Sequence, residues 1–280
     1  MKRLTLSLAF IILSTCLFAQ QSTYSRIKVT ASDEQLILLA GEGIDITEGV
    51  LKRDGFLIAE LSENEIAKVE GLGLNYEVII EDVSKYYVER NAGKSSDIAD
   101  YKGTSEWEVP ENFTFGTMSG HATFDEVVDH LDNMYELFPD LITQKESIGI
   151  TGEDRDLWMV KISDNPTVNE TEPEVLYTSL HHAREPAGLM TNLFFMYYLL
   201  ENYDSDPFIQ SLVDNTELYF IPVINPDGYV YNQTINPSGG GMWRKNRHDN
   251  GIPGCEGIDL NRNYDYMWGL DNIGSSPDPC

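Results

Sequence analysis

An alternation of apolar segments in the second half of the chain constrains its fold more than any other feature. Residues 175–180 and 218–224 are apolar runs with the length of a buried strand. Residues 187–200, between them, are almost wholly apolar, which suits a buried helix and is too short to span a membrane comfortably. Strands that alternate with helices predict an α/β sheet whose loops carry the chemistry.

The sequence before these segments adds one helix and one pair of strands. Thr123 and Glu126 have the spacing of a capping box, and apolar residues follow them at helical intervals. Residues 141–150 and 157–162 are predicted as paired strands around a Gly-Glu-Asp turn. We therefore expect one domain over residues 113–280.

A smaller unit is expected over residues 21–90. Residues 26–30 alternate as a strand, and Asp33 can cap a short helix. The rest is predicted as a hairpin around Asp54-Gly55, a helix opened by a Ser62–Glu65 capping box, and a strand at 76–80. The order strand-helix-strand-strand-helix-strand predicts a small α+β ferredoxin-like unit.

Two other segments are predicted to be processed or exposed. Residues 1–20 combine Lys2 and Arg3 with an apolar run and a small residue, the pattern of a secretory signal peptide. A membrane anchor and lipoprotein processing at Cys16 are the alternatives. Residues 91–112, rich in Gly and Ser, are interpreted as an exposed linker. We therefore expect a secreted, extracellular or periplasmic protein without stable membrane insertion.

Charge and cysteine content limit the partners of the chain. Its 46 acidic and 19 basic residues give a net charge of −27, which makes nucleic acid an unsuitable partner. Once the signal peptide is removed, Cys255 and Cys280 remain, and an even number in an oxidising compartment favours one disulfide between them. Cys280 is the last residue, so it could equally lack that partner.

His182 and Glu185 form the first candidate site, at the point where a predicted strand gives way to a predicted helix. An imidazole and a carboxylate three residues apart can bind one Zn²⁺ and leave coordination positions open. Alone the pair is weak evidence, because a histidine at a strand end is often a satisfied structural residue. With further groups around it, the pair would indicate metal-assisted hydrolysis.

Four patches in a fixed order supply those groups. They are His-Ala-Arg-Glu at 182–185, Asn-Pro-Asp-Gly-Tyr at 225–229, Trp-Arg-Lys-Asn-Arg at 243–247 and Gly-Ile-Asp-Leu-Asn-Arg-Asn at 257–263. From about residue 113 onward the chain resembles the zinc carboxypeptidases of the carboxypeptidase A and B type, most closely their secreted bacterial members. The resemblance implies the mixed-sheet α/β fold of that family and removal of C-terminal residues from peptides and proteins. The layout of the first unit also resembles the family's activation segment, for which an activating protease would be a partner; whether the unit is cleaved is left open.

The same resemblance implies a role for each matching residue. His182 and Glu185 would bind Zn²⁺, and Arg244 would stabilise the oxyanion that forms at the scissile carbonyl. Asn261 and Arg262 would bind the free α-carboxylate of the substrate, which distinguishes a chain end from an internal peptide bond.

Neighbouring residues are expected to have supporting roles. Arg184 would contact the substrate further from its end, and Asp259 could orient the ligand imidazole. His181 is interpreted as structural. Asn225 and Asp227 are interpreted as turn-forming residues.

Two parts of the family's site have no match in this sequence. The family's third zinc ligand is a histidine that comes later in the chain, and its general base is a later glutamate. The histidines of this chain are His121, His130, His181, His182 and His248, and the last glutamate is Glu256. We therefore expect a fragment of a longer enzyme that binds zinc weakly and is inactive alone, with residues 175–180 left as an unpaired sheet edge. In the family, Cys280 falls where the partner of Cys255 often lies.

Two other functions remain open. A non-catalytic peptide-binding domain would keep Arg262 but lose the metal chemistry. A hydrolase of cell-wall peptides would keep the metal chemistry, although Asn261 and Arg262 favour an ordinary α-carboxylate as the target.

Overall fold

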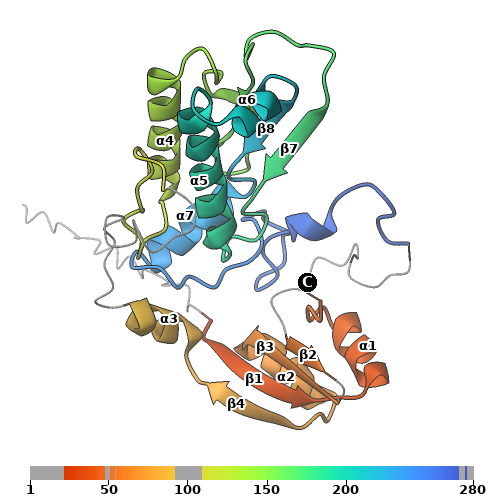
Figure 1. Cartoon of the computed structure of the whole chain (residues 1–280). Coiled ribbons are helices and arrows are strands. Elements are labelled where there is room, and N and C mark those ends of the chain that lie inside the picture. Colours follow the sequence, from red (N-terminus) through yellow and green to blue (C-terminus); the bar gives the residue numbers. More distant parts are fainter. Residues whose placement is uncertain (1–21, 48–50, 54, 92–108, 271–274, 276–280) are drawn as a thin grey trace, which may run out of the picture.

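The computed structural model describes residues 22–47, 51–53, 55–91, 109–270 and 275. The described residues form two four-stranded sheets with their helices and loops, one sheet in each half of the chain (Figure 1). The predicted signal peptide at 1–20 and most of the predicted linker at 91–112 lie outside the described residues. The boundaries proposed for both stay predictions.

The first sheet confirms the ferredoxin-like order. Its four strands are all antiparallel and lie in the order β2-β3-β1-β4. The elements are β1 (Tyr24–Thr30), α1 (Asp33–Gly41), β2 (Leu51–Arg53), β3 (Phe56–Ser62), α2 (Glu63–Gly71), β4 (Tyr76–Ile80) and α3 (Val83–Asn91). Helix α3 was not expected from the sequence.

Alternation and capping explain these elements. Ile27 and Val29 alternate with more exposed residues along β1, so one face of the sheet is buried against α1 and α2. The Ser62–Glu65 capping box opens α2 as predicted. The prediction for α1 was wrong by one residue: Ser32 caps that helix, because its side chain accepts from the backbone N–H of residue 35.

The second sheet is mixed, as the resemblance to the carboxypeptidase family implied. It has the order β5-β6-β8-β7, in which β7 runs parallel to β8 and the other pairs are antiparallel. The elements are α4 (Phe124–Leu137), β5 (Glu146–Ile150), β6 (Asp156–Ile162), β7 (Glu174–Thr178), α5 (Pro186–Asn202), α6 (Pro207–Val213), β8 (Glu217–Ile221), α7 (Pro226–Ile235) and the 3₁₀ turn η2 (Leu260–Arg262).

One apolar core joins this sheet to its helices. The Thr123–Glu126 capping box opens α4 as predicted, and apolar residues of α4 and α5 pack with those of β6 and β8. The strand predicted at 141–150 begins only at Glu146, since Ile142 forms no more than an isolated bridge to Ile162. Among the residues described, no helix is both long and apolar enough to cross a bilayer.

Strand β7 lies at the edge of the described sheet rather than in its interior. Leu176 is 57% exposed, so the segment interpreted as a buried strand is open along one side. This matches the expectation of an unpaired edge at 175–180. Because β7 and β8 are parallel neighbours, the loops that follow them leave the sheet at the same end, and that end holds the candidate site.

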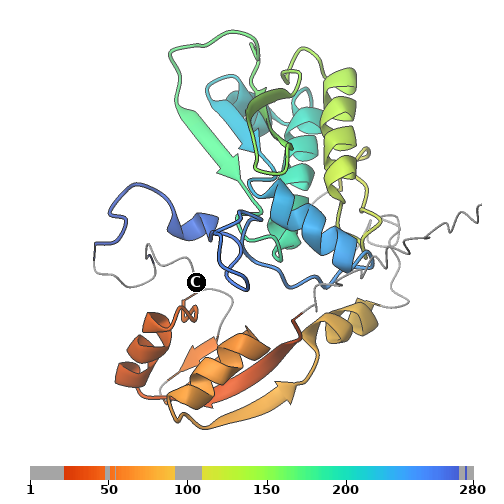
Figure 2. The same cartoon turned by 180° about the vertical axis from the view of Figure 1, so that it is seen from behind.

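Helix α7 corrects a second prediction. Residues 225–228 were interpreted as a turn, but Asn225 caps α7 and Pro226 occupies its first turn. Figures 1 and 2 show the segment that follows α7 between the two sheets, with the first unit on its far side. Residues of that segment and of the first unit therefore meet near the loop after β7.

Candidate active site

The loop between β7 and α5 presents the predicted metal pair. His182 is 3% exposed, whereas the side chain of Glu185 is 49% exposed. The Nδ1 atom of His182 lies 3.0 Å from Oε2 of Glu185. A backbone bond from Glu185 N to His182 O, 3.1 Å, closes the loop into a tight turn, so the two side chains share one side of it.

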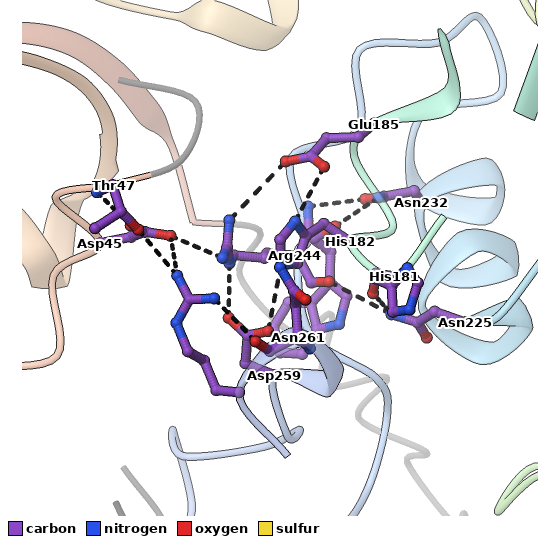
Figure 3. A network of polar contacts seen from close by, with 12 residues as sticks. Asp45, Thr47, His181, His182, Glu185, Asn225, Asn232, Arg244, Asp259 and Asn261 are labelled. Carbon is purple, nitrogen blue, oxygen red and sulfur yellow. Dashed lines mark hydrogen bonds and ion pairs between the residues drawn. The ribbon is translucent and has the colours of Figure 1, made fainter. Parts of the chain in front are cut away.

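Asp259 fixes the other nitrogen of the same imidazole. Its Oδ1 is 3.3 Å from Nε2 of His182, and its Oδ2 accepts from Nε of Arg244 at 2.9 Å (Figure 3). Burial opposes ionisation of Asp259, but the bond from His182 and the charge of Arg244 hold its pKa well below the ordinary value. The orienting position expected for Asp259 is therefore present in the structure.

The pair fits Zn²⁺ by chemistry and by spacing. Nitrogen and carboxylate oxygen are both zinc ligands, and two such ligands in a tetrahedral site lie ~3.3 Å apart. The observed 3.0 Å between His182 Nδ1 and Glu185 Oε2 is close to that value. Burial disfavours protonation of His182, but Asp259 and Glu185 outweigh it and raise the pKa of the imidazole, so a metal ion would replace a proton held between the two side chains.

A separate acidic cluster differs from this pair in chemistry. Asp164, Glu170 and Glu172 are the only described group of three or more candidate ligands whose atoms lie within 4.8 Å of one another. The group contains only carboxylates, which suit hard cations better than zinc. Within the described residues, no third ligand of that kind completes the His182–Glu185 pair.

Arg244 lies beside the metal pair. Its Nη1 atom is 3.9 Å from Oε1 of Glu185, and its side chain is 12% exposed. Asp259 accepts from its Nε, which holds one edge of the guanidinium and leaves Nη1 on the side of Glu185 and Nη2 on the side of Asp45. A fixed cation in this place can stabilise negative charge that develops next to the metal pair.

The structure brings Asn261 and Arg262 to the same place through η2. Asp259 caps this turn and accepts from the backbone N–H of Asn261 at 2.9 Å. Arg262 Nη2 and Arg244 Nη2 contact the same carboxylate oxygen, that of Asp45. The two guanidiniums therefore converge on one anion position, as a carboxylate-binding site requires.

Arg184 lies in the same loop as the metal pair but is near Tyr24 of the first unit. It is half-buried and stands close enough to Tyr24, at the start of β1, to act on its phenol. Burial raises the pKa of Tyr24 to about 12, and the charge of Arg184 opposes that rise. The substrate contact expected for Arg184 stays a prediction.

The anion between the guanidiniums comes from the first unit, which the sequence did not predict. Asp45 Oδ2 lies 2.8 Å from Arg244 Nη2 and 3.1 Å from Arg262 Nη2 (Figure 3). Thr47 adds a contact from its Oγ1 to Arg262 Nη2 at 3.2 Å. Asp45 belongs to no sequence motif. Only its contacts with residues far away in the sequence distinguish it from the other acidic residues of the chain.

Other contacts join the first unit to the second. The carbonyl oxygen of Ser84, in α3, comes so close to Gly240 that a Cβ there would lie 2.8 Å from it. Tyr24 is half-buried near Arg184 and Tyr231. Asp45 is thus one of several contacts that hold the units together.

The predicted disulfide stays untested. Cys255 lies in the loop before η2, whereas Cys280 falls outside the described residues. His181, interpreted as structural, has its ring Nε2 2.6 Å from the hydroxyl of Tyr264. The interpretation of His181 as structural stays a prediction.

Known proteins resemble the chain in sequence and in fold. The model of the family described as zinc carboxypeptidase matches residues 127–280. A zinc carboxypeptidase from Saccharothrix mutabilis subsp. capreolus is 35% identical over 247 residues, which cover 86% of this chain and 52% of that protein. Carboxypeptidase A2 from Mus musculus is 32% identical over 212 residues, 76% of this chain and 46% of the mouse protein.

Among solved structures, carboxypeptidase A from Helicoverpa armigera matches 93% of this chain and 61% of its own, with a TM-score of 0.66 and 24% identity. That likeness bears on the fold alone. The chain spans about half the length of the curated relatives that it matches.

Proposed function

Because the chain belongs to the zinc carboxypeptidase family, we propose that the protein is a secreted zinc metallocarboxypeptidase that removes C-terminal residues from peptides and proteins. One observation carries the proposal. Arg244 and Arg262 share a single carboxylate next to the His182–Glu185 pair. A peptide's terminal carboxylate can replace that of Asp45 and would bring its last peptide bond close to the pair.

Some residues of the site would bind the substrate, and others would take part in the reaction. Zn²⁺, when bound by His182 and Glu185, supplies a Lewis acid that polarises the carbonyl and lowers the pKa of water. Arg262 binds the α-carboxylate, with Asn261 beside it in η2. Arg244, oriented by Asp259, stabilises the negative charge that develops on the scissile carbonyl oxygen.

Activity of the whole enzyme needs more than the described residues offer. Two described side chains form the metal pair, and a catalytic zinc site of this type uses three protein ligands. We expect the 280-residue chain, expressed by itself, to bind zinc weakly and to lack peptidase activity. Tight stoichiometric zinc together with turnover would contradict this.

We further propose that the first unit is an inhibitory activation segment. Asp45 supplies the carboxylate that the substrate would otherwise supply, so the uncleaved protein blocks its own site. Arg90, Lys94 and Lys102 in and beside the predicted linker offer cleavage sites to an activating protease.

A peptide-binding domain without catalysis is the second candidate. The convergence of Arg244 and Arg262 on one carboxylate favours binding whether or not a metal site is complete. Such a protein would bind peptide C-termini without zinc and would not hydrolyse them. The cell-wall alternative would need a substrate without an ordinary free α-carboxylate.

The test compares a blocked dipeptide with a free α-carboxylate and the same dipeptide as its amide. We expect zinc-dependent hydrolysis of the acid only, measured on the purified whole enzyme, rather than on the 280-residue chain, after release of the first unit. Arg262→Ala should raise KM for the acid by roughly 30- to 150-fold, the loss of a charged hydrogen-bond pair worth about 2–3 kcal/mol. Arg262→Lys should recover part of the loss, because it keeps the charge but not the fork.

Lys145→Ala is the matched control, since it removes a cation of the second unit that pairs with Asp132 of α4 rather than with a residue of the site. Equal hydrolysis of acid and amide would exclude carboxylate recognition. Zinc-independent binding without hydrolysis would decide for the binding domain.

A further inference from the structure

Two buried carboxamides on α7 connect the segments that carry the site. Asn225 is 1% exposed and Asn232 is 3% exposed. They are seven residues apart at the cap and in the second turn of the helix, so they share one face of it. Figure 3 shows both directed at the loop of the metal pair.

Asn225 contacts two segments of the site, loop 181–185 and residues 243–244, with one side-chain nitrogen. Its Nδ2 donates to the carbonyl oxygen of His181 at 3.0 Å and to that of Arg244 at 3.4 Å. Its Oδ1 accepts from the backbone N–H of Gly228 at 3.0 Å, the capping bond of the helix. The donor and the acceptor of this amide therefore have separate tasks.

Asn232, seven residues further along α7, contacts the same two segments. Its Nδ2 donates to the carbonyl oxygens of Ala183 and Trp243, at 3.0 and 2.8 Å. Its Oδ1 accepts from the backbone N–H of Trp243 at 2.9 Å. Between the two amides, Ala183 N bonds directly to Arg244 O at 3.0 Å.

Close packing leaves the helix no room to shift against these segments. A Cβ at Gly228 would lie 2.4 Å from Lys245 O and 2.9 Å from the Cβ of Ala183. A Cβ at Gly241 would lie 2.6 Å from Oδ1 of Asn232. Both segments thus rest directly on α7, where the amides bind them.

We infer that Asn225 and Asn232 are positioning residues whose side-chain NH₂ groups hold loop 181–185 and residues 243–244 in one register. His182 and Glu185 belong to the first segment and Arg244 to the second. The amides therefore set the distance between the metal pair and the cation that faces the reacting carbonyl. The inference rests on the proposed function, in which these three residues act on one peptide bond, and a shift of about 1 Å there can cost about 100-fold in rate.

Exchange of asparagine for aspartate separates this role from capping. Asn225→Asp keeps the acceptor that caps α7 and replaces the NH₂ donor with a charged oxygen. Asn232→Asp does the same for the bond from Trp243, and Asn232→Leu removes the donor without adding charge. Asn236→Asp, at the end of the same helix, is the control, because its amide bonds to neither segment among the described residues.

Three quantities are measured on the whole enzyme after release of the first unit: affinity for Zn²⁺ by chelator competition, kcat and KM for the blocked dipeptide acid, and hydrogen exchange of the Ala183 amide. We expect each donor-deleted variant to exchange that amide faster and to bind Zn²⁺ about tenfold more weakly, as for other groups that orient metal ligands. We also expect kcat to fall at least tenfold with KM within about threefold, because Arg262 lies on neither segment. Asn236→Asp should match the unaltered protein in all three.

The possible outcomes distinguish a failure of this inference from a failure of the proposed function. A whole, unaltered enzyme without zinc binding and turnover would refute the proposed function, and Ala183 exchange would still test the positioning. Variants that keep kcat, zinc affinity and slow exchange would overturn the inference while the function stands. Failure of all three donor-deleted variants to fold would also overturn it, since the amides would then serve the fold rather than the register.

Discussion

Removal of the Asp45 carboxylate should open the site of the uncleaved protein. Asp45 accepts from Arg244 at 2.8 Å and from Arg262 at 3.1 Å, with all three side chains at most one quarter exposed. A hydrogen bond between charged groups contributes about 1.5–3 kcal/mol, and partial exposure favours the lower figure. Two such bonds give about 3 kcal/mol, so a ligand that competes with Asp45 should bind roughly 100-fold more tightly to Asp45→Ala.

The assay is equilibrium binding of a blocked dipeptide with a free carboxylate to the uncleaved, metal-free protein, by calorimetry. Glu34→Gln, an exposed acid in the same unit, is the control for overall charge. We expect a large gain in affinity for Asp45→Ala and none for Glu34→Gln. An Asp45→Ala gain below threefold, or an equal gain in both variants, would refute the view that Asp45 occupies the carboxylate position.

Two predictions concern stability. Lys161→Met should cost about 3–5 kcal/mol in urea unfolding, because it leaves the fully buried Glu217 carboxylate, now 2.8 Å from Lys161 Nζ, without its cation. Adding Glu217→Leu should recover most of that loss, whereas a cost below 1 kcal/mol for the single change would argue against a buried pair. Burial lowers the pKa of His130, which contacts the Tyr197 hydroxyl, below its ordinary 6.5, so the unfolded chain binds a proton that the folded one does not. Stability should therefore fall as pH drops below about 6.5, and His130→Gln should remove that part of the pH dependence; an unchanged slope would contradict it.

Much of the fold follows from local sequence signals. The Ser62 and Thr123 capping boxes, and the hairpin that joins β2 to β3, lie where pattern and turn chemistry predicted them. These features depend on residues a few positions apart. The resemblance carried by the four patches also implied that His182 and Arg262 belong to one site.

The remainder depends on contacts that sequence spacing does not reveal. Asn225, Pro226 and the two residues after them are all common in turns. Asn and Pro are equally suited to the start of a helix, and packing against the Arg244 segment favours the helix here. Asp45 and Arg262 are 217 positions apart, so their contact exists only once two separate sheets have folded and docked.

Anomalous X-ray diffraction at the zinc edge, from crystals of the zinc-loaded protein, tests the central claim most directly. We expect an anomalous peak between Nδ1 of His182 and the carboxylate of Glu185, and its loss in Glu185→Gln crystals. A peak confined to the Asp164–Glu170–Glu172 cluster, with none at His182, would contradict the assignment of the metal site and the mechanism built on it.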